Sequence, residues 1–178
     1  FDLNRCIQKQ IGEFARSAGG SFPVVFRSTG AQLIRGDEAQ IREALRLLMT
    51  NAQEAMVAGG TITIEVGQVV LTEASAQGHP DARPGSYVTL TLSDTGGGIT
   101  AEVLGQVFDP YFSTSGLAVK RGLGLAVAYG ILRQSGGMIE AHSSVGTNTF
   151  FRMYFPALPP RPQPRRPAEP ETILVVDD

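Results

Sequence analysis

The stretch Asp94-Thr95-Gly96-Gly97-Gly98-Ile99 follows a segment in which apolar and polar residues alternate, Tyr87–Leu92. The alternation predicts a strand, with Val88, Leu90 and Leu92 on one face. A carboxylate then stands where the strand ends, and the glycines behind it let the backbone turn sharply and approach a ligand closely. An ionised carboxylate only accepts hydrogen bonds, so it can bind the exocyclic amine of adenine, whereas guanine has a carbonyl there. An ordinary turn with aspartate as turn former is the alternative.

A long helix is predicted before this strand. It starts at Asp37, a plausible cap, with Gln40 able to reach back to it, and it ends at Gly59-Gly60. Asn51 lies at the edge of its apolar stripe, where the amide oxygen is a suitable ligand for magnesium. A half-exposed polar residue without a ligand is the alternative. The stripe consists of Ile41, Ala44, Leu45, Leu48, Ala52, Ala55 and Met56.

Two segments after the glycine-rich stretch also have features that suit a ligand-binding site. Phe108–Arg121 has no clear period and predicts a long loop, whose aromatic residues could bury over a ligand or in a satellite cluster. Gly122-Leu123-Gly124-Leu125 opens a helix, whose free N–H groups and positive dipole end suit a phosphate chain. Lys120 and Arg121 add charge beside it. Close helix–sheet packing is the alternative, and the stretch matches neither a P-loop nor a dinucleotide fingerprint.

The other segments complete an α+β pattern. Helical spacing predicts a helix in Phe1–Ala18 after a short strand, and alternation predicts several more strands. The expected fold is therefore a mixed sheet with helices on one face. The remaining expectations are strands at Phe22–Arg27, Thr61–Val66 extended by Gln68–Leu71, and a hairpin of Met138–His142 with Thr149–Phe155; pairing at Ala31–Ile34; helices at Ala101–Val107 and Leu123–Gln134; and a loop at Thr72–Gly85.

Composition narrows the classes of function. In 178 residues, a hydrophobic fraction of 42% and a charged fraction of 18% are typical of a globular domain. The net charge of −2 gives no excess of positive charge to hold nucleic acid or an anionic membrane, and the longest apolar stretch, Leu123–Leu132, is too short to cross a bilayer. Cys6 has no second cysteine to pair with, and two histidines leave little material for a zinc site.

The two ends of the chain indicate a piece of a longer protein. Phe1 opens it without an initiator methionine, which predicts an excised fragment. Most of the prolines fall between residues 156 and 170, which predicts an extended linker over residues 157–170. Residues 171–178 then begin a new apolar strand, Ile173–Val176, that ends in two aspartates.

Over Phe1–Pro156 the chain resembles the catalytic ATP-binding domain of sensor histidine kinases, in the superfamily shared with gyrase, the heat-shock chaperones and MutL. Each motif has a counterpart in that family. Within the family, the motif sequences are closest to those of nitrogen-regulator-type and hybrid kinases. Leu47–Ala55 resembles the asparagine box, Asp94–Ile99 the first glycine box, Phe108–Thr114 the phenylalanine box, Gly122–Ile131 the second glycine box, and Ser135–Gly137 with Gly146–Phe150 the closing hairpin.

The resemblance implies a two-layer α/β sandwich of the Bergerat type with ATP and Mg²⁺ as cofactors. It assigns Asn51 to magnesium and phosphate, Asp94 to the adenine amine and Thr149 to a water-linked contact beside Asp94. It makes Phe108–Arg121 a mobile lid. The other residues that it implies for ATP binding are Ala55, Gly96, Gly98, Ile99, Phe112, Lys120, Arg121, Gly122, Leu123 and Gly124.

The resemblance also implies a reaction and partners. A protein-histidine kinase of this kind presents the γ-phosphate of Mg-ATP to a histidine on separate dimerisation helices, in the cytoplasm or in the cytoplasmic part of a membrane-bound sensor. Ile173–Asp178 resembles the first strand of a receiver domain, so a hybrid kinase with a receiver, or a separate response regulator, is the expected partner. No contact with nucleic acid or membrane is expected of this piece, and neither His79 nor His142 has the helical setting of an acceptor.

Two other functions stay open from the sequence, and both depend on Leu47. Many kinases of the family carry an asparagine there, and its absence is compatible with a degenerate nucleotide-binding or interaction module. The other is a self-contained ATPase of the gyrase or chaperone type, but gyrase-type ATPases carry a glutamate base there, so Leu47 argues against independent hydrolysis. Further departures from the family pattern are Ser115, Arg121 and Asn148.

Overall fold

A computed structural model of the chain describes residues 1–19, 22–76, 82–112 and 122–158. Its centre is a five-stranded sheet with the order β1-β2-β3-β5-β4. β1 runs parallel to β2, and the other neighbours are antiparallel, so the sheet is mixed, as the sequence predicts. The strands are β1 Val24–Ser28, β2 Ile62–Leu71, β3 Gly85–Asp94, β4 Met138–Ser144 and β5 Asn148–Pro156.

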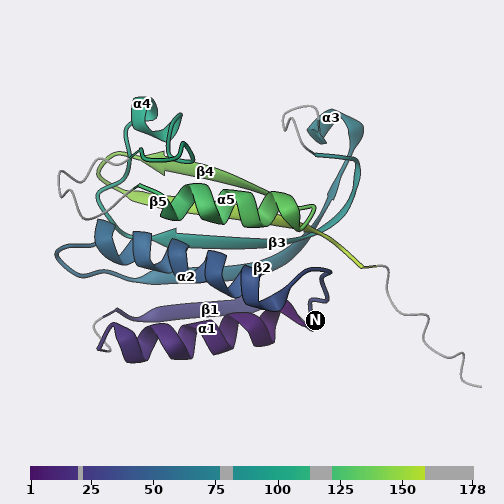
Figure 1. Cartoon of the computed structure of the whole chain (residues 1–178), viewed down its shortest axis with the longest axis horizontal. Coiled ribbons are helices and arrows are strands. Elements are labelled where there is room, and N and C mark those ends of the chain that lie inside the picture. The colour runs from purple at the N-terminus through teal and green to yellow at the C-terminus, as the bar shows by residue number, and fades with distance from the viewer. Residues whose placement is uncertain (20–21, 77–81, 113–121, 159–178) are drawn as a thin grey trace, which may run out of the picture.

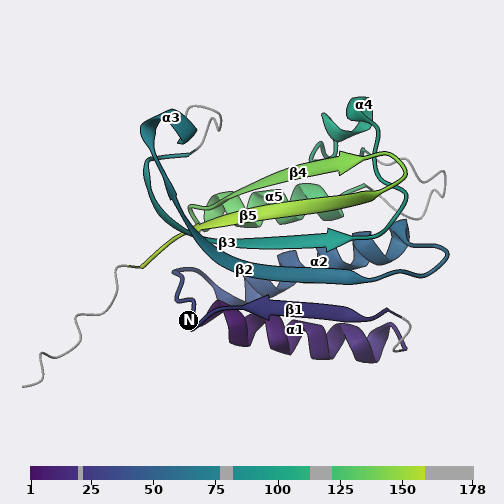
Figure 2. The same ribbon diagram turned by 180° about the vertical axis from the view of Figure 1, so that it is seen from behind.

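Three helices cover one face of this sheet: α1 Leu3–Ser17, α2 Glu38–Ala55 and α5 Gly124–Gln134 (Figure 1). Figure 2 shows the opposite face, where the strands lie in front of the helices. Two short helices, α3 Glu73–Ala76 and α4 Ala101–Leu104, lie at opposite ends of the sheet (Figure 1). The expected fold class, an α+β two-layer sandwich, is confirmed.

The core forms between the sheet and the three long helices, and β3 and α2, the two elements with the clearest sequence patterns, contribute to it. Val88, Leu90 and Leu92 are all buried, as their alternation predicts. Leu48 of α2 is also fully buried in the same hydrophobic cluster. Asp37 caps α2, because its carboxylate accepts from the N–H groups of Ala39 and Gln40 at 2.8 and 3.3 Å.

Two expectations about elements were wrong. Ala55 is exposed rather than part of the buried stripe, because α2 ends there and the buried row runs from Ala52 to Met56, one turn on. The expected loop Thr72–Gly85 contains α3, whose first turn is held by Thr72, with its N–H donating to Ser75 Oγ at 2.8 Å. Four residues are too few to produce a helical period, which is why the sequence does not predict this turn.

Smaller differences concern the ends of elements. The expected opening strand and the segment Ala31–Ile34 are reduced to isolated bridges, in which Asp2 pairs with Leu33 and Ile34 with Ala157. α4 ends at Leu104, earlier than expected. Within the described ranges, no helix combines the length and the hydropathy that crossing a membrane requires.

Asp37→Ala should lower the free energy of unfolding by about 1 kcal/mol, because two N–H groups at the start of α2 lose their acceptor. Asp37→Asn is the matched control, since an asparagine side chain caps as well as aspartate does. Urea unfolding of the three proteins measures the difference. Equal losses in both variants would contradict a capping role.

Candidate functional site

Asp94 is the last residue of β3, and its carboxylate is buried at the end of the sheet. Only 1% of the residue is exposed. Oδ1 accepts a hydrogen bond from the N–H of Gly96 at 2.9 Å, whereas Oδ2 is buried and has no partner among the described residues. A buried acceptor without a donor is costly and is usually satisfied by something outside the protein chain. The site therefore fits a ligand that brings a hydrogen-bond donor to Oδ2.

Burial also sets the charge state of this group. It raises the pKa of Asp94, while the backbone N–H groups of Gly96 and Thr149 oppose that shift. The folded protein without ligand thus holds the ionised carboxylate at a cost. A donor from a ligand would favour the ionised form and offset part of this cost.

Glycines follow Asp94 because the backbone is crowded on both sides. A Cβ at Gly96 would lie 2.8 Å from Asp94 Oδ1 and 2.9 Å from the carbonyl oxygen of Ala55. Gly98 has φ +73°, and a Cβ there would overlap the carbonyl of Ser144. The turn is also tied to the β4–β5 hairpin, since Gly146 N–H donates to Gly97 O at 2.8 Å. The predicted importance of Gly96 and Gly98 thus has a steric reason.

The last turns of α2 lie beside this glycine turn. Ala55 is the residue of α2 next to the turn, since a Cβ on Gly96 would lie 2.9 Å from its carbonyl oxygen. Asn51 lies one helical turn before Ala55, on the same side of the helix. Asn51 is half-buried, and its amide makes no hydrogen bond within the described residues. The described parts of the chain hold no cluster of three acidic, histidine or cysteine side chains for a metal. A hard cation at Asn51 would therefore need oxygens from phosphate and water as well.

The start of α5 offers backbone donors. Leu123 precedes the helix without a side-chain cap, so the N–H groups of its first turn, which begins at Gly124, are not capped by that residue. Leu47 of α2 lies below this turn, with Cδ2 3.6 Å from the position of a Cβ on Gly124. Gly122 has φ +59°, and a Cβ on it would overlap the carbonyl of Phe112. Phe112 and Gly122 are thus brought together, while Lys120 and Arg121 lie outside the described residues.

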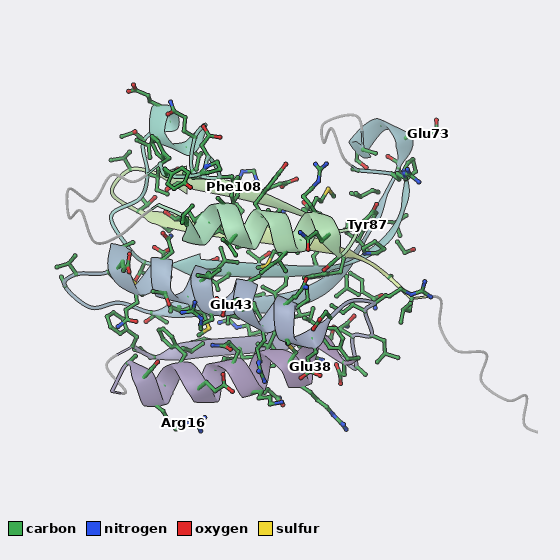
Figure 3. The ribbon with its side chains drawn as sticks, in the orientation of Figure 1. Arg16, Glu38, Glu43, Glu73, Tyr87 and Phe108 are labelled. Carbon is green, nitrogen blue, oxygen red and sulfur yellow. The ribbon has the colours of Figure 1, made fainter. Side chains whose placement is uncertain are left out.

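The described residues of the aromatic segment, 108–112, differ in their burial. Phe108 packs on Tyr129 and Phe151, with ring centroids 5.3 and 6.3 Å away, and Figure 3 shows it beside α5. Tyr111 is 75% exposed and has φ +67°. Phe108 thus packs against the main hydrophobic core, so the alternative of a separate satellite cluster is wrong for this residue. The rest of the expected lid, residues 113–121, lies outside the described residues.

Thr149 and Ser143 complete the site on the side of the hairpin. Thr149 pairs with Asp94 across β5 and β3 and is 2% exposed. Ser143 of β4 pairs with Thr149, and its Oγ accepts from the N–H of Ile99 at 2.7 Å. Ser143 is not predicted from the sequence, because one serine in a strand carries no pattern.

Comparisons with known proteins show the family to which the chain belongs. Residues 36–159 match the family model described as histidine kinase-, DNA gyrase B- and HSP90-like ATPase. The chain belongs to this family. Among curated proteins it is 36% identical over 125 residues to sensor kinase CckA of Brucella abortus, and 37% identical over 157 residues to sensor histidine kinase ZraS of Klebsiella oxytoca. These matches cover 70% and 87% of the chain, but only 13% and 30% of the two relatives.

A solved structure of the mycobacterial sensor histidine kinase MprB is similar in fold, with a TM-score of 0.72 and 19% identity. The match covers 89% of this chain and 98% of that one. The chain is thus a catalytic ATPase domain of the sensor histidine kinase type, and it spans less than a third of the length of the two curated relatives. Among the described residues, Asp94 Oδ2 has no donor and Leu123 provides no side-chain cap for the first turn of α5, so the two places are compatible with a ligand that brings a donor to the first and an acceptor to the second.

Gly98→Ala should lower the free energy of unfolding by more than about 1 kcal/mol, because a left-handed alanine is strained and its Cβ overlaps the Ser144 carbonyl. Gly97→Ala is the control, since nothing lies within 4 Å of a Cβ there. Denaturant unfolding compares the two. A Gly98→Ala protein as stable as Gly97→Ala would contradict the close approach of turn and hairpin.

Asp94→Asn should stabilise the protein without nucleotide while weakening ATP binding. The pKa of Asp94 is raised by burial, so the carboxyl favours folding fully below its unfolded pKa, and this contribution is lost as the pH rises through the folded pKa. The stability advantage of the variant should therefore grow with pH across the acidic range and level off towards neutrality. The lost charge-assisted bond should cost about 1.5–3 kcal/mol of ATP binding.

Unfolding curves at several pH values and calorimetric titration with ATP measure the two effects. Asp109→Asn, an exposed aspartate in the turn after Phe108, controls for the change in net charge. A variant that binds ATP like the wild type would remove Asp94 from the adenine site.

Proposed function

We propose that this chain binds Mg-ATP at the end of its sheet and, as part of a longer protein-histidine kinase, presents the γ-phosphate to a histidine on separate dimerisation helices. The observation that carries the proposal is the buried Oδ2 of Asp94, which lacks a donor among the described residues. An adenine amine would supply that donor. A guanine carbonyl would instead set two acceptors against each other.

The proposal gives the other parts of the site separate roles. Asn51 would contribute an oxygen to Mg²⁺, and the first turn of α5, from Gly124 on, would bind phosphate oxygens through N–H groups. Thr149 would act through a water next to Asp94. When bound, Mg²⁺ would neutralise charge on the phosphates. Ala55, Gly96, Gly98, Ile99, Phe112, Lys120, Arg121, Gly122 and Leu123 complete the proposed set, of which Lys120 and Arg121 lie outside the described residues.

The position of Leu47 favours phosphotransfer over independent hydrolysis. Its side chain is half-buried and lies against Gly124, which leaves an apolar group where gyrase-type relatives carry a base. Water near the phosphates would find no general base at this point. A phosphate group then needs an acceptor from another domain.

Further proposals concern the longer protein. We propose that the longer protein carries the acceptor helices and has a receiver domain or a separate response regulator as its partner. We also propose that this part of the protein lies in the cytoplasm. The linker at 157–170 and the receiver strand at 171–178 stay predictions, and from residue 159 on these segments lie outside the described residues. Residues 1–156 would form the ATP-binding unit.

The isolated chain should bind Mg-ATP but remain unphosphorylated. ATP at about a hundred times its dissociation constant should add roughly 2.7 kcal/mol to the free energy of unfolding. His142 lies on a strand, with its ring stacked on Phe150 at 4.7 Å, and not on an amphipathic helix. His79 lies outside the described residues.

Incubation with γ-labelled ATP and magnesium tests this expectation. Label should appear only when histidine-bearing kinase helices are added as a second chain, and it should appear on that chain. The Asp94→Asn protein is the control for dependence on the proposed adenine site. Acid-labile label on this chain alone would overturn the proposal.

A further inference from the structure

A row of paired side chains crosses the end of the sheet from β4 to β2. Ser143 pairs with Thr149, Thr149 with Asp94, and Asp94 with Ile62. Directly paired residues point to the same face of a sheet. Ile62 is fully buried, and Asp94 and Thr149 are 1% and 2% exposed, so this is the face that the helices cover. The row therefore brings three polar groups to the proposed adenine site.

Ser143 has three hydrogen-bonding neighbours. Its Oγ lies 2.7 Å from the N–H nitrogen of Ile99, 2.9 Å from the carbonyl oxygen of Asn148 and 2.9 Å from Thr149 Oγ1. A serine hydroxyl has one proton and two lone pairs. Ile99 can only donate and the Asn148 carbonyl can only accept, so these two contacts use one lone pair and the proton.

The third contact then has one possible direction. Only the second lone pair of Ser143 is left, so the hydroxyl of Thr149 must donate to it. If Ser143 donated to Thr149 instead, its oxygen would face the Asn148 carbonyl without a proton between them at 2.9 Å. The proton of Thr149 is thus turned towards Ser143, and Thr149 Oγ1 keeps its lone pairs for other donors.

We propose that Ser143 is a positioning residue that makes Thr149 a hydrogen-bond acceptor and thereby sets the preference for a 6-amino purine over a 6-oxo purine. Asp94 and Thr149 then present two acceptors side by side. An exocyclic amine can donate to both directly, or a water that donates its two protons to Asp94 and Thr149 keeps its lone pairs for the amine. A 6-oxo group meets two acceptors and is rejected more strongly than by Asp94 alone. This inference rests on the proposed ATP site.

The test compares ATP with inosine triphosphate, which carries a carbonyl in place of the amine and has the same triphosphate. Ser143→Ala frees the Thr149 hydroxyl to turn and donate. ATP affinity should fall about three- to tenfold, while affinity for inosine triphosphate stays equal or rises. The dissociation constant for inosine triphosphate divided by that for ATP should therefore drop by about threefold or more. Calorimetric titration with each nucleotide and Mg²⁺ gives both constants.

Three matched variants separate positioning from a structural role. Ser143→Thr keeps the hydroxyl and should keep the wild-type ratio. Ser93→Ala, on the opposite face of β3, should leave both constants unchanged. In a Thr149→Val background, Ser143→Ala should no longer change the ratio, because no hydroxyl is left to turn. If Ser143→Ala does not fold, Ser143→Cys replaces it, since a thiol of similar size is a weak donor and acceptor.

The outcomes are distinct. The role of Ser143 is overturned if Ser143→Ala weakens the affinity for both nucleotides equally and so leaves the ratio unchanged. It is also overturned if Ser143→Ala changes the ratio as much in the Thr149→Val background as in the wild type. Failure of the wild type to bind ATP overturns the proposed function itself, whereas wild-type binding with an unchanged ratio in the Ser143→Ala protein overturns this inference alone.

Discussion

The burial of one carboxylate at the end of β3 is the constraint to which the rest of the site responds. Asp94 sits in the strand that lies between β2 and β5, so both of its neighbours in the sheet are already paired. Two backbone N–H groups, those of Gly96 and Thr149, oppose the effect of burial on its pKa, but Oδ2 has no donor in the part of the chain that the structure describes. The protein thus holds a destabilising group in place, as binding sites often do. A ligand that donates a hydrogen bond to Asp94 offsets part of the free-energy cost of burying this carboxylate.

Close backbone approach follows from that placement. To bring a ligand to Asp94, the end of α2, the glycine turn and the β4–β5 hairpin must converge within van der Waals distance. Gly96 lies against the carbonyl of Ala55, and Gly98 against that of Ser144. A side chain at either position would separate the elements that carry Asn51 and Thr149. Glycine is therefore needed here for space, and at Gly98 also for its positive φ.

The sequence predicts those parts of the fold whose signal is local. β3 follows from strict alternation, and α2 from the Asp37 cap and its apolar stripe. Ala55 was misplaced because a stripe read from spacing cannot show where the helix ends and the chain turns to the glycines. Ser143 could not be found at all, because its role depends on Ile99 and Thr149, which only the folded sheet brings to it. Asp94 could be predicted because strand, carboxylate and glycines are contiguous.

The two halves of the proposed site are built differently, and this has a consequence for specificity. The base half rests on paired strands, in which Ser143 is paired with Thr149 and Thr149 with Asp94. The phosphate half depends on backbone N–H groups of α5, held against α2 by the apolar contact of Leu47 with Gly124. Backbone donors bind any triphosphate alike, so they add affinity without selecting a base. In the proposed site, discrimination between nucleotides must therefore come from the sheet, where we propose that the direction of the Thr149 hydroxyl proton adds to the selectivity of Asp94.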